Sequence, residues 1–407
     1  MKLHASSVLF ILCMSSPVIA EVRTGLELLA AKNFEPFRGK RVGLVVNHTA
    51  VDRKGRHLVD LLKEAKIEIG AIFGPEHGYR GINDAGANVA DEKAEGIPIY
   101  SLYGNKKYKP TPEQMKGLDL LVFDIQDVGV KFYTYISTLY YTLEAAAEAK
   151  IPFWVLDRPN PIRGDAVSGP ICETAHLSFV GIKPFPVRHG LTVGELARLF
   201  SGEGWLAGGA KADVHVVELE GWSRKQWFDA SGLPWIPPSP NLPTLDGAIL
   251  YPGTCLWEGT NLSEGRGTDT PFEVQGAPWV DAKKWKAAME ALSPPGAAFD
   301  AVDFSPRSIP GKSASPKFKG QACRGLRIRI TDRDRLDALR LGLELVQTVR
   351  DLHPKEFKFS NYFDTLMGTA KTREAIEKGV PVADIVKTWA SDETRFRKQR
   401  EPYLLYR

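Results

Sequence analysis

The strongest constraint on the fold is an alternation of short apolar strands with helices in the N-terminal half. The strand segments are rich in β-branched residues and bounded by Gly, Pro, Asn or Asp, as strands buried on both faces are. These segments are residues 41–47, 67–73, 97–102, 119–124, 153–157 and 214–219. Helical patterns lie between them at residues 58–66, 135–150 and 190–201. The alternation predicts an α/β fold with a Rossmann-like, doubly wound parallel sheet.

The chain length and a change of composition near residue 236 predict a second domain. With 407 residues, the chain can form two domains that each bury a core. Residues 236–280 show little periodicity, and so long a stretch without regular structure usually carries function. Beyond it, a strand at 325–331 and helices at 335–352, 372–378 and 381–393 indicate a smaller α/β domain. We expect a catalytic domain over 21–235, an active-site loop or linker over 236–280 and a C-terminal domain over 281–407.

Residues 1–20 have the composition of a secretory signal peptide. Lys2 supplies the positive charge, residues 8–14 form a short apolar core, and small residues lead to Ala20. Leu12 before Cys13 does not suit a lipoprotein site. We therefore expect cleavage after Ala20 and export. The periplasm is the favoured location because no anchoring segment follows, although export from a cell with one membrane would place the protein outside. No later stretch approaches about 18 apolar residues, so we expect no stable membrane insertion.

Charge and motif content argue against several classes of function. The 53 Lys and Arg against 49 Asp and Glu give a net charge of +4 without a dense basic run, so no nucleic-acid partner is expected. Cleavage would leave Cys172, Cys255 and Cys323, which make no disulfide framework, although one pair could form. The chain has no Cys-x-x-Cys, no His-Glu-x-x-His, no Walker A loop and no Gly-x-Gly-x-x-Gly after the first strand. We therefore expect no metal and no cofactor.

Polar residues follow four of the predicted strands. Open parallel sheets bind ligands beyond the carboxyl ends of their strands, so these residues should gather at one rim. In chain order they are Asn47 and His48, then Glu76, His77 and Arg80, then Asp124 and Asp127, and finally Arg158 and Asn160. The pattern predicts a ligand site at this rim.

Glu76 and His77 stand in a Gly-Pro-Glu-His-Gly turn, which projects side chains and exposes backbone N–H groups. A carboxyl beside an imidazole suits general acid catalysis, because a neighbouring group can hold its pKa near the working pH. The alternative is that Glu76 only caps the next helix. Asp124 and Asp127 could supply a second carboxylate, or could be ordinary turn formers or caps.

Arg158 lies in an Asp-Arg-Pro-Asn-Pro segment at the end of the strand at 153–157. Its planar guanidinium could bind an anionic group through two hydrogen bonds. The alternative is an ion pair with Asp157 or Asp127, and the sequence does not choose between the two.

Residues 257–268 form the other dense polar cluster, with two carboxylates, one Arg and three Gly in twelve residues. The segment could be a solvent loop, but the Pro-rich residues 237–243 before it favour an ordered segment. The candidate ligand-binding side chains in this cluster are Glu258, Asn261, Ser263, Glu264 and Arg266.

Four segments carry a family resemblance. They are Gly-Pro-Glu-His-Gly-x-Arg-Gly at 74–81, Asp-Ile-Gln-Asp-Val-Gly at 124–129, Asp-Arg-Pro-Asn-Pro at 157–161 and Glu-Gly-Thr-Asn-x-Ser-Glu-Gly-Arg-Gly-Thr at 258–268. Together they resemble the exo-β-N-acetylmuramidase family called NamZ, formerly a domain of unknown function, and the resemblance runs over essentially the whole mature chain. It implies a Rossmann-like domain, a smaller α/β domain and an active cleft between them. It also implies that Glu76 is the proposed catalytic glutamate.

The resemblance further implies an exo-acting glycoside hydrolase that releases N-acetylmuramic acid from non-reducing ends of peptidoglycan fragments, such as muropeptides or disaccharides. Glu76 would protonate the leaving oxygen. Candidates for the second catalytic group are Asp124, Asp127 and Glu264. The 2-acetamido group of the substrate could also take that role. The lactyl carboxylate of muramic acid would pair with Arg158 or Arg266.

Two other functions stay open at this point. An exported sugar-binding protein without catalysis would have the same architecture of two domains around a cleft. A metal-dependent cell-wall amidase or deacetylase is the second alternative. Its candidate ligands are His48, His77, Asp124 and Asp127, although they lack a recognised ligand spacing.

Overall fold

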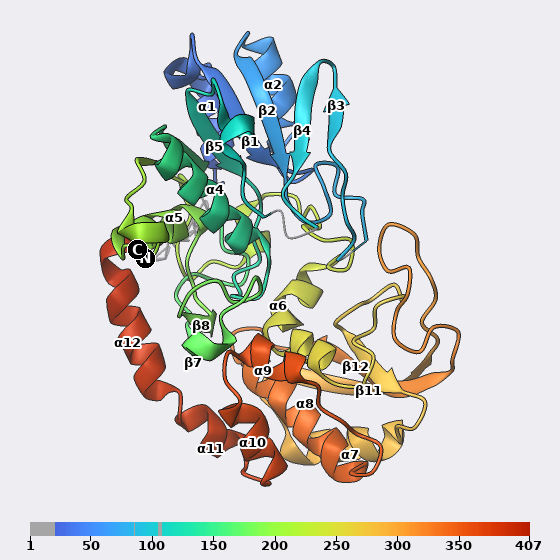
Figure 1. Ribbon diagram of the computed structural model, residues 1–407. Coiled ribbons are helices and arrows are strands. Elements are labelled where there is room, and N and C mark those ends of the chain that lie inside the picture. Colours follow the sequence, from blue (N-terminus) through green and yellow to red (C-terminus); the bar gives the residue numbers. More distant parts are fainter. Residues whose placement is uncertain (1–20, 85, 105–107) are drawn as a thin grey trace, which may run out of the picture.

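The computed structural model describes residues 21–84, 86–104 and 108–407, and the predicted signal peptide at 1–20 lies outside these ranges. The chain forms a larger N-terminal unit around a seven-stranded sheet and a smaller C-terminal unit around a three-stranded sheet (Figure 1). In the described ranges, no helix combines the length and the apolar character that crossing a membrane would require.

The large sheet confirms the predicted doubly wound parallel topology. Its strands are β1 (Arg41–Val46), β2 (Glu68–Gly74), β3 (Glu92–Ala94), β4 (Ile97–Ser101), β5 (Leu120–Asp124), β6 (Phe153–Leu156) and β9 (Val214–Val217). The order is β3-β4-β2-β1-β5-β6-β9, and every neighbouring pair is parallel except β3 and β4. The chain thus builds outward from β1 in both directions, which is the Rossmann order. The short antiparallel β3 was not predicted.

Helices cover both faces of this sheet. They are α1 (Gly25–Ala31), α2 (Leu58–Glu64), α3 (Pro112–Met115), α4 (Tyr135–Ala149) and α5 (Val193–Gly202). On β1, Val42, Leu44 and Val46 belong to the core cluster formed with α1 and α2, whereas Val45 belongs to the cluster formed with α4 and α5. All four side chains are fully buried. Burial on both faces explains why the strand sequences are continuously apolar.

The smaller unit confirms a second α/β assembly. Its antiparallel sheet has the order β10 (Val274–Ala277), β12 (Cys323–Ile330), β11 (Ala297–Phe304). Its helices are α6 (Leu245–Thr254), α7 (Ala282–Leu292), α8 (Ala338–Leu352), α9 (Asn361–Met367), α10 (Lys371–Glu377) and α11 (Val382–Lys387). The sequence did not indicate β10, β11, α6 or α7. The expectation that residues 236–280 lack regular structure is wrong, since α6 and β10 lie there.

Shorter elements complete the described chain. A two-stranded sheet pairs β7 (Ser168–Ile171) with β8 (Pro186–Arg188). The 3-10 helices are η1 (Glu35–Phe37), η2 (Thr174–His176), η3 (Ala207–Gly209), η4 (Phe228–Ser231), η5 (Cys255–Gly259) and η6 (Glu401–Tyr403).

Helix α6 packs against α8 through a contact between two glycines. A Cβ atom added to Gly342 would lie 2.4 Å from the carbonyl oxygen of Gly253, which is closer than any side chain tolerates. Because α6 continues into η5 and the polar loop behind it, this contact fixes where that loop lies. This packing places α6 with the smaller unit, and pairing with β12 places β10 there. The domain boundaries at 235 and 280 stay a prediction.

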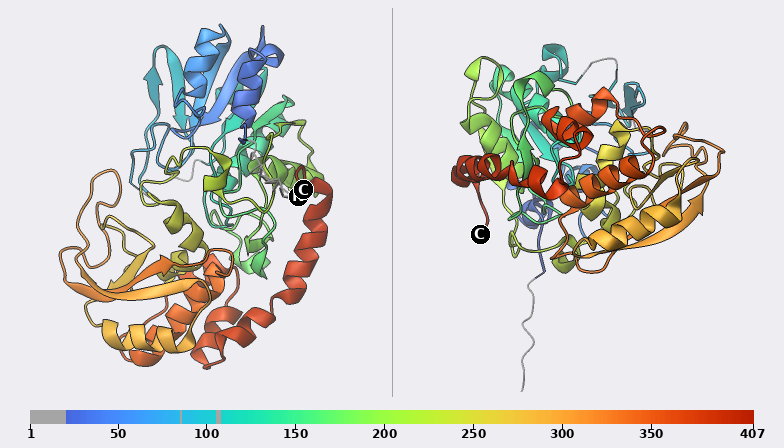
Figure 2. Two further views of the ribbon diagram at one scale, coloured as in Figure 1. Left: turned by 180° about the vertical axis from the view of Figure 1, so that it is seen from behind. Right: turned by 90° about the horizontal axis from the view of Figure 1, so that it is seen from below.

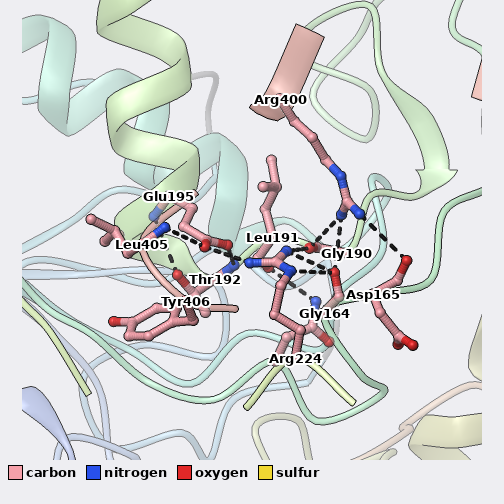
Figure 3. A network of polar contacts seen from close by, with 12 residues as sticks. Gly164, Asp165, Gly190, Leu191, Thr192, Glu195, Arg224, Arg400, Leu405 and Tyr406 are labelled. Atoms are coloured by element: carbon pink, nitrogen blue, oxygen red, sulfur yellow. Dashed lines mark hydrogen bonds and ion pairs between the residues drawn. The ribbon is translucent and has the colours of Figure 1, made fainter. Parts of the chain in front are cut away.

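The C-terminal segment returns from the small unit to the large one. Helix α12 (Ala390–Arg400) runs along one side of the molecule and packs against β7 and β8 (Figures 1 and 2). At its end, Nη1 of Arg400 donates hydrogen bonds to the carbonyl oxygens of Gly164, at 3.0 Å, and Gly190, at 2.7 Å (Figure 3). Beyond η6, the backbone N–H of Leu405 binds Oε1 of Glu195 at 2.9 Å. The tail therefore holds the two units together.

Near the end of this segment, the hydroxyl of Tyr406 lies inside the large unit. It donates to Oδ2 of the fully buried Asp157 at 2.6 Å and accepts from the N–H of Leu219 at 2.9 Å. We expect Tyr406→Phe to lower the free energy of unfolding by about 1–3 kcal/mol, because a buried carboxylate loses a donor. Tyr403→Phe, whose hydroxyl binds the more exposed Glu203, should cost less. Urea unfolding of both variants checks this, and equal losses would contradict it.

Candidate active site

A cavity of about 560 Å³ lies between the two units, beyond the carboxyl ends of β2, β4 and β5. The large unit contributes the loops that follow these strands, and the small unit contributes η5, the polar loop after it and the segment between β11 and β12. Five residues of the predicted site line the cavity, namely Glu76, His77, Glu258, Glu264 and Arg266. The structure therefore brings together the Pro-Glu-His-Gly turn and the 258–268 segment, which are far apart in the sequence.

Glu76 is held from two sides. The backbone N–H of Gly86 donates to Oε1 at 2.9 Å, and the hydroxyl of Thr134, at the start of α4, donates to Oε2 at 2.6 Å. Burial and then the negative charge of Glu76 raise the pKa of Tyr103, which stays protonated beside the carboxylate. Among the described residues, no ion pair neutralises Glu76. Its carboxyl group is therefore fixed in orientation without an ion pair to any cation that the structure describes.

His77 is buried and has a left-handed backbone, with φ of 68°. Its Nδ1 lies 2.7 Å from the carbonyl oxygen of Asn83, and the Asn83 side-chain amide donates to the His77 carbonyl at 3.0 Å. A carbonyl can only accept, so Nδ1 carries the proton. Burial lowers the pKa of His77, so the ring is neutral near pH 7 and Nε2 is an acceptor. These two hydrogen bonds between His77 and Asn83 close the loop that carries Glu76.

The turn that carries Glu76 requires glycine at position 81, because His48 packs against the turn there. Gly81 has φ of 68°, and a Cβ atom there would lie 1.9 Å from Nδ1 of His48. The other ring nitrogen of His48, Nε2, lies 2.8 Å from the carbonyl oxygen of Pro237. His48 therefore supports the turn and connects it to the Pro-rich segment before α6.

Arg266 organises the opposite wall of the cavity. Its Nη2 donates to Oε1 of Glu258 at 2.8 Å, and its Nε lies 3.4 Å from Oε1 of Glu264. The guanidinium also lies over the ring of Phe272, 5.2 Å from the centroid. Burial alone would lower the pKa of Arg266, but the two carboxylates raise it, so the group stays charged. Glu258 and Glu264 are therefore both paired with a cation, whereas no ion pair among the described residues involves Glu76.

Lys317 fastens this wall to the segment between β11 and β12. Its Nζ donates to the carbonyl oxygens of Trp257, at 3.0 Å, and of Thr260 and Leu262, each at 2.9 Å. It also lies 3.3 Å from Oε2 of Glu264. These contacts shape η5 and the polar loop into one side of the cavity.

Asp124 and Arg158 do not line the cavity. Asp124 is fully buried, and Arg158 donates from Nε to Oδ1 at 2.5 Å and from Nη2 to Oδ2 at 3.0 Å. Arg158 thus forms an ion pair with Asp124, rather than with the Asp157 or Asp127 that the sequence suggested. The pair joins the ends of β5 and β6, and its groups are occupied with each other.

Asp127 also lies outside the cavity lining. Its Oδ2 accepts from the N–H of Gly129 at 2.7 Å and lies 3.9 Å from Nε2 of the buried His189. Burial raises the pKa of Asp127 to about 7. Its geometry therefore resembles that of a buried turn carboxylate, and its catalytic role stays a prediction.

Five other predicted binding residues are not among those that line the cavity, and their roles also stay predictions. Four of them bond to nearby backbone: Asn47 to Thr49, Asn160 to Ile162 and Leu191, Asn261 to Glu356 and Lys358, and Ser263 to Gly265. The fifth, Arg80, lies on the surface 3.8 Å from Glu92.

Several cavity residues were not identified from the sequence. Asp84, Tyr103 and Thr134 come from loops after predicted strands, so their position at the carboxyl edge was an available signal. Lys317 and Tyr362 come from the small unit. No motif marks them, because only the folded arrangement brings them to the cavity.

The residues that could form a metal site or a disulfide are not gathered. His48, His77, Asp124 and Asp127 each bond elsewhere, and no three His, Cys, Asp or Glu side chains of the described chain are placed to hold a metal ion. The side chains suggested as metal ligands therefore do not fit one ion. Cys172, Cys255 and Cys323 are buried and free.

Comparison with known proteins gives a consistent assignment. Residues 42–246 match the family model "Exo-beta-N-acetylmuramidase NamZ, N-terminal", and residues 249–406 match its C-terminal counterpart. The chain is 44% identical over 392 residues, 95% of this chain and 92% of the relative, to the Peptidoglycan beta-N-acetylmuramidase NamZ of Bacillus subtilis (strain 168).

Crystal structures agree with this result. Two DUF1343 family proteins from Bacteroides fragilis NCTC 9343 have TM-scores of 0.86 and 0.79 and are 35% and 36% identical to this chain. The matches cover 96% and 95% of this chain and 100% and 99% of theirs. On these matches over nearly its whole length, the chain belongs to the exo-β-N-acetylmuramidase NamZ family.

Proposed function

We propose that Glu76 is the general acid with which this protein releases N-acetylmuramic acid from non-reducing ends of peptidoglycan fragments. By its family, the chain is an exo-β-N-acetylmuramidase and hence a glycoside hydrolase. The observation that carries the assignment of Glu76 is the set of contacts that its carboxyl group makes in the cavity. It is the family-motif carboxylate, it is oriented by Gly86 and Thr134, and no cation of the described residues neutralises it.

Hydrolysis of a glycoside needs an acid that protonates the leaving oxygen. A carboxyl group held by two donors keeps one geometry throughout the reaction, which supports proton transfer at a fixed position. Neutral His77 supports this role by fixing the loop through Asn83. The cavity volume of about 560 Å³ is within the usual range for small-ligand sites, about 300–1,000 Å³.

The cavity wall that contains Arg266 suits the lactyl carboxylate of the substrate. Muramic acid differs from glucosamine by a lactyl group that ends in a carboxylate. Of the two arginines considered for it, Arg158 is occupied by Asp124 outside the cavity, whereas Arg266 lines it. We therefore propose the Arg266 wall, with Lys317 behind it, as the side that faces the lactyl group.

The loss of kcat that follows removal of the acid should depend on the leaving group. We expect Glu76→Gln to lower kcat on a muramyl-N-acetylglucosamine disaccharide by about 100- to 10,000-fold. The loss should be smaller on p-nitrophenyl N-acetylmuramic acid, because nitrophenolate leaves without full protonation. Steady-state kinetics on both substrates checks this, with Glu92→Gln, at the start of β3 and outside the cavity lining, as the matched control. Equal losses on both substrates would contradict the role as acid.

The same assay separates the alternative functions. A sugar-binding protein would bind the disaccharide without releasing either sugar. A metal-dependent hydrolase would lose activity when a chelator is added, whereas we expect full activity after chelation and dialysis. Loss of activity that returns with added metal would contradict the proposal.

We also propose that the protein is exported, with the periplasm as the favoured location. The support is the pattern of charge, apolar core and small residues in 1–20. Expression of the full chain in a host with a periplasm should give a mature protein that begins at Glu21, as read by intact mass. Ala20→Arg should block this cleavage, because the peptidase requires a small residue there. A chain that retains Met1, or one lipidated at Cys13, would contradict the proposal.

A further inference from the structure

One carboxylate of the cavity neither pairs with Arg266 nor takes part in the proposed proton transfer. Asp84 lines the cavity, and its Oδ1 is buried without a hydrogen-bond partner among the residues that the structure describes. It follows Asn83, which pairs with His77, and precedes Gly86, whose N–H binds Glu76. Asp84 is therefore held on the same closed loop as Glu76, between the two attachments that fix it.

The other carboxylates near the cavity are already paired. Glu258 and Glu264 bind Arg266, and Glu264 also contacts Lys317. None of the ion pairs in the described ranges involves Asp84, as none involves Glu76. A buried carboxylate oxygen without a donor is costly, so its position favours a ligand that brings an N–H group. The substrate carries one such group next to the reacting carbon, the N–H of its 2-acetamido group.

We propose that Asp84 accepts the 2-acetamido N–H of N-acetylmuramic acid and positions the acetamido oxygen for attack on C1. This proposal rests on the proposed function, because it needs the muramyl sugar in this cavity. It supplies the second group that glycoside hydrolysis requires without a protein nucleophile. Of the three carboxylates that the sequence suggested for that role, Asp124 and Asp127 do not line the cavity, and Glu264 is paired with Arg266 and Lys317.

The reaction then has two balanced steps. In the first, the acetamido oxygen forms a bond to C1 while the bond from C1 to the leaving oxygen breaks, and Glu76 gives its proton to that oxygen. The product is an oxazolinium ring whose N–H⁺ lies against the Asp84 carboxylate. In the second, water attacks C1, its proton returns to Glu76, and the ring opens to restore the acetamido group. The proposal predicts retention of the anomeric configuration.

The test compares two chromogenic substrates, p-nitrophenyl N-acetylmuramic acid and its N-trifluoroacetyl analogue. Fluorine withdraws electrons from the amide oxygen, so the wild type should cleave the analogue at least about 100-fold more slowly if that oxygen is the nucleophile. Asp84→Asn should lower kcat on the acetyl substrate about 100- to 1,000-fold with little change in KM, because it removes charge that matters in the transition state.

The ratio of the rates on the acetyl and trifluoroacetyl substrates distinguishes a positioning role of Asp84 from a structural role. Loss of Asp84 should shrink the difference between the substrates, because the acetamido group is no longer held for attack. A structural role would slow both substrates equally and leave the ratio unchanged. Asp91→Asn, on the same loop but outside the cavity lining, is the matched control and should keep the wild-type ratio. Asp84→Glu retains the charge and should recover part of kcat, and it replaces Asp84→Asn if that variant does not fold.

The outcomes separate this proposal from the proposed function. Release of N-acetylmuramic acid from the disaccharide by the wild type is measured first, and its absence would refute the function itself. With that release established, an unchanged substrate ratio in both Asp84 variants, or a wild-type rate that does not respond to fluorine, would overturn the role of Asp84. Inversion of configuration, read by nuclear magnetic resonance of the released sugar, would also overturn it.

Discussion

Hydrogen bonds that Glu76 accepts from Gly86 and Thr134 tie the chemistry of the cavity to the parallel sheet. One donor, Gly86, belongs to the loop of Glu76 itself, and the other, Thr134, begins the helix α4. Helix α4 packs on β5 and β6, so the carboxyl group is positioned relative to the sheet core rather than to a free loop. A catalytic group needs this support, because small displacements weaken interactions with the transition state.

The opposite wall depends on the small unit in a similar way. The close contact of α6 with α8 places η5, and Arg266 and Lys317 then hold the polar loop in shape. The site is therefore complete only when both units keep their relative position. Helix α12 and the segment after it, which includes Tyr406, connect the units (Figure 1), and Figure 3 shows polar contacts of this segment with the large unit. A segment remote from the cavity thus stabilises the arrangement on which the cavity depends.

The large sheet could be predicted from the sequence because strands buried on both faces are continuously apolar. Helix α6 could not, since it contains Pro252 and two glycines, and the close packing against α8 that explains Gly253 is visible only in the folded structure. In the site, the Glu76 turn and the 258–268 segment are marked by dense polar motifs. Lys317 carries no such mark, because long-range contacts bring it to the cavity, whereas Asp84 is marked only by its place in the loop after β2. Arg158 and Asp124 show that a polar motif at the carboxyl edge of the sheet does not always mark the cavity, since these two residues bind each other.

The most direct test of this account is a crystal structure of the Glu76→Gln variant with a muramyl-N-acetylglucosamine disaccharide. The account predicts the non-reducing sugar in the cavity between the units, with the glycosidic oxygen within hydrogen-bonding distance of the side chain at position 76. The acetamido N–H would face Asp84, and the lactyl group would face the Arg266 wall. A disaccharide bound elsewhere, or bound with its glycosidic oxygen remote from position 76, would contradict the account.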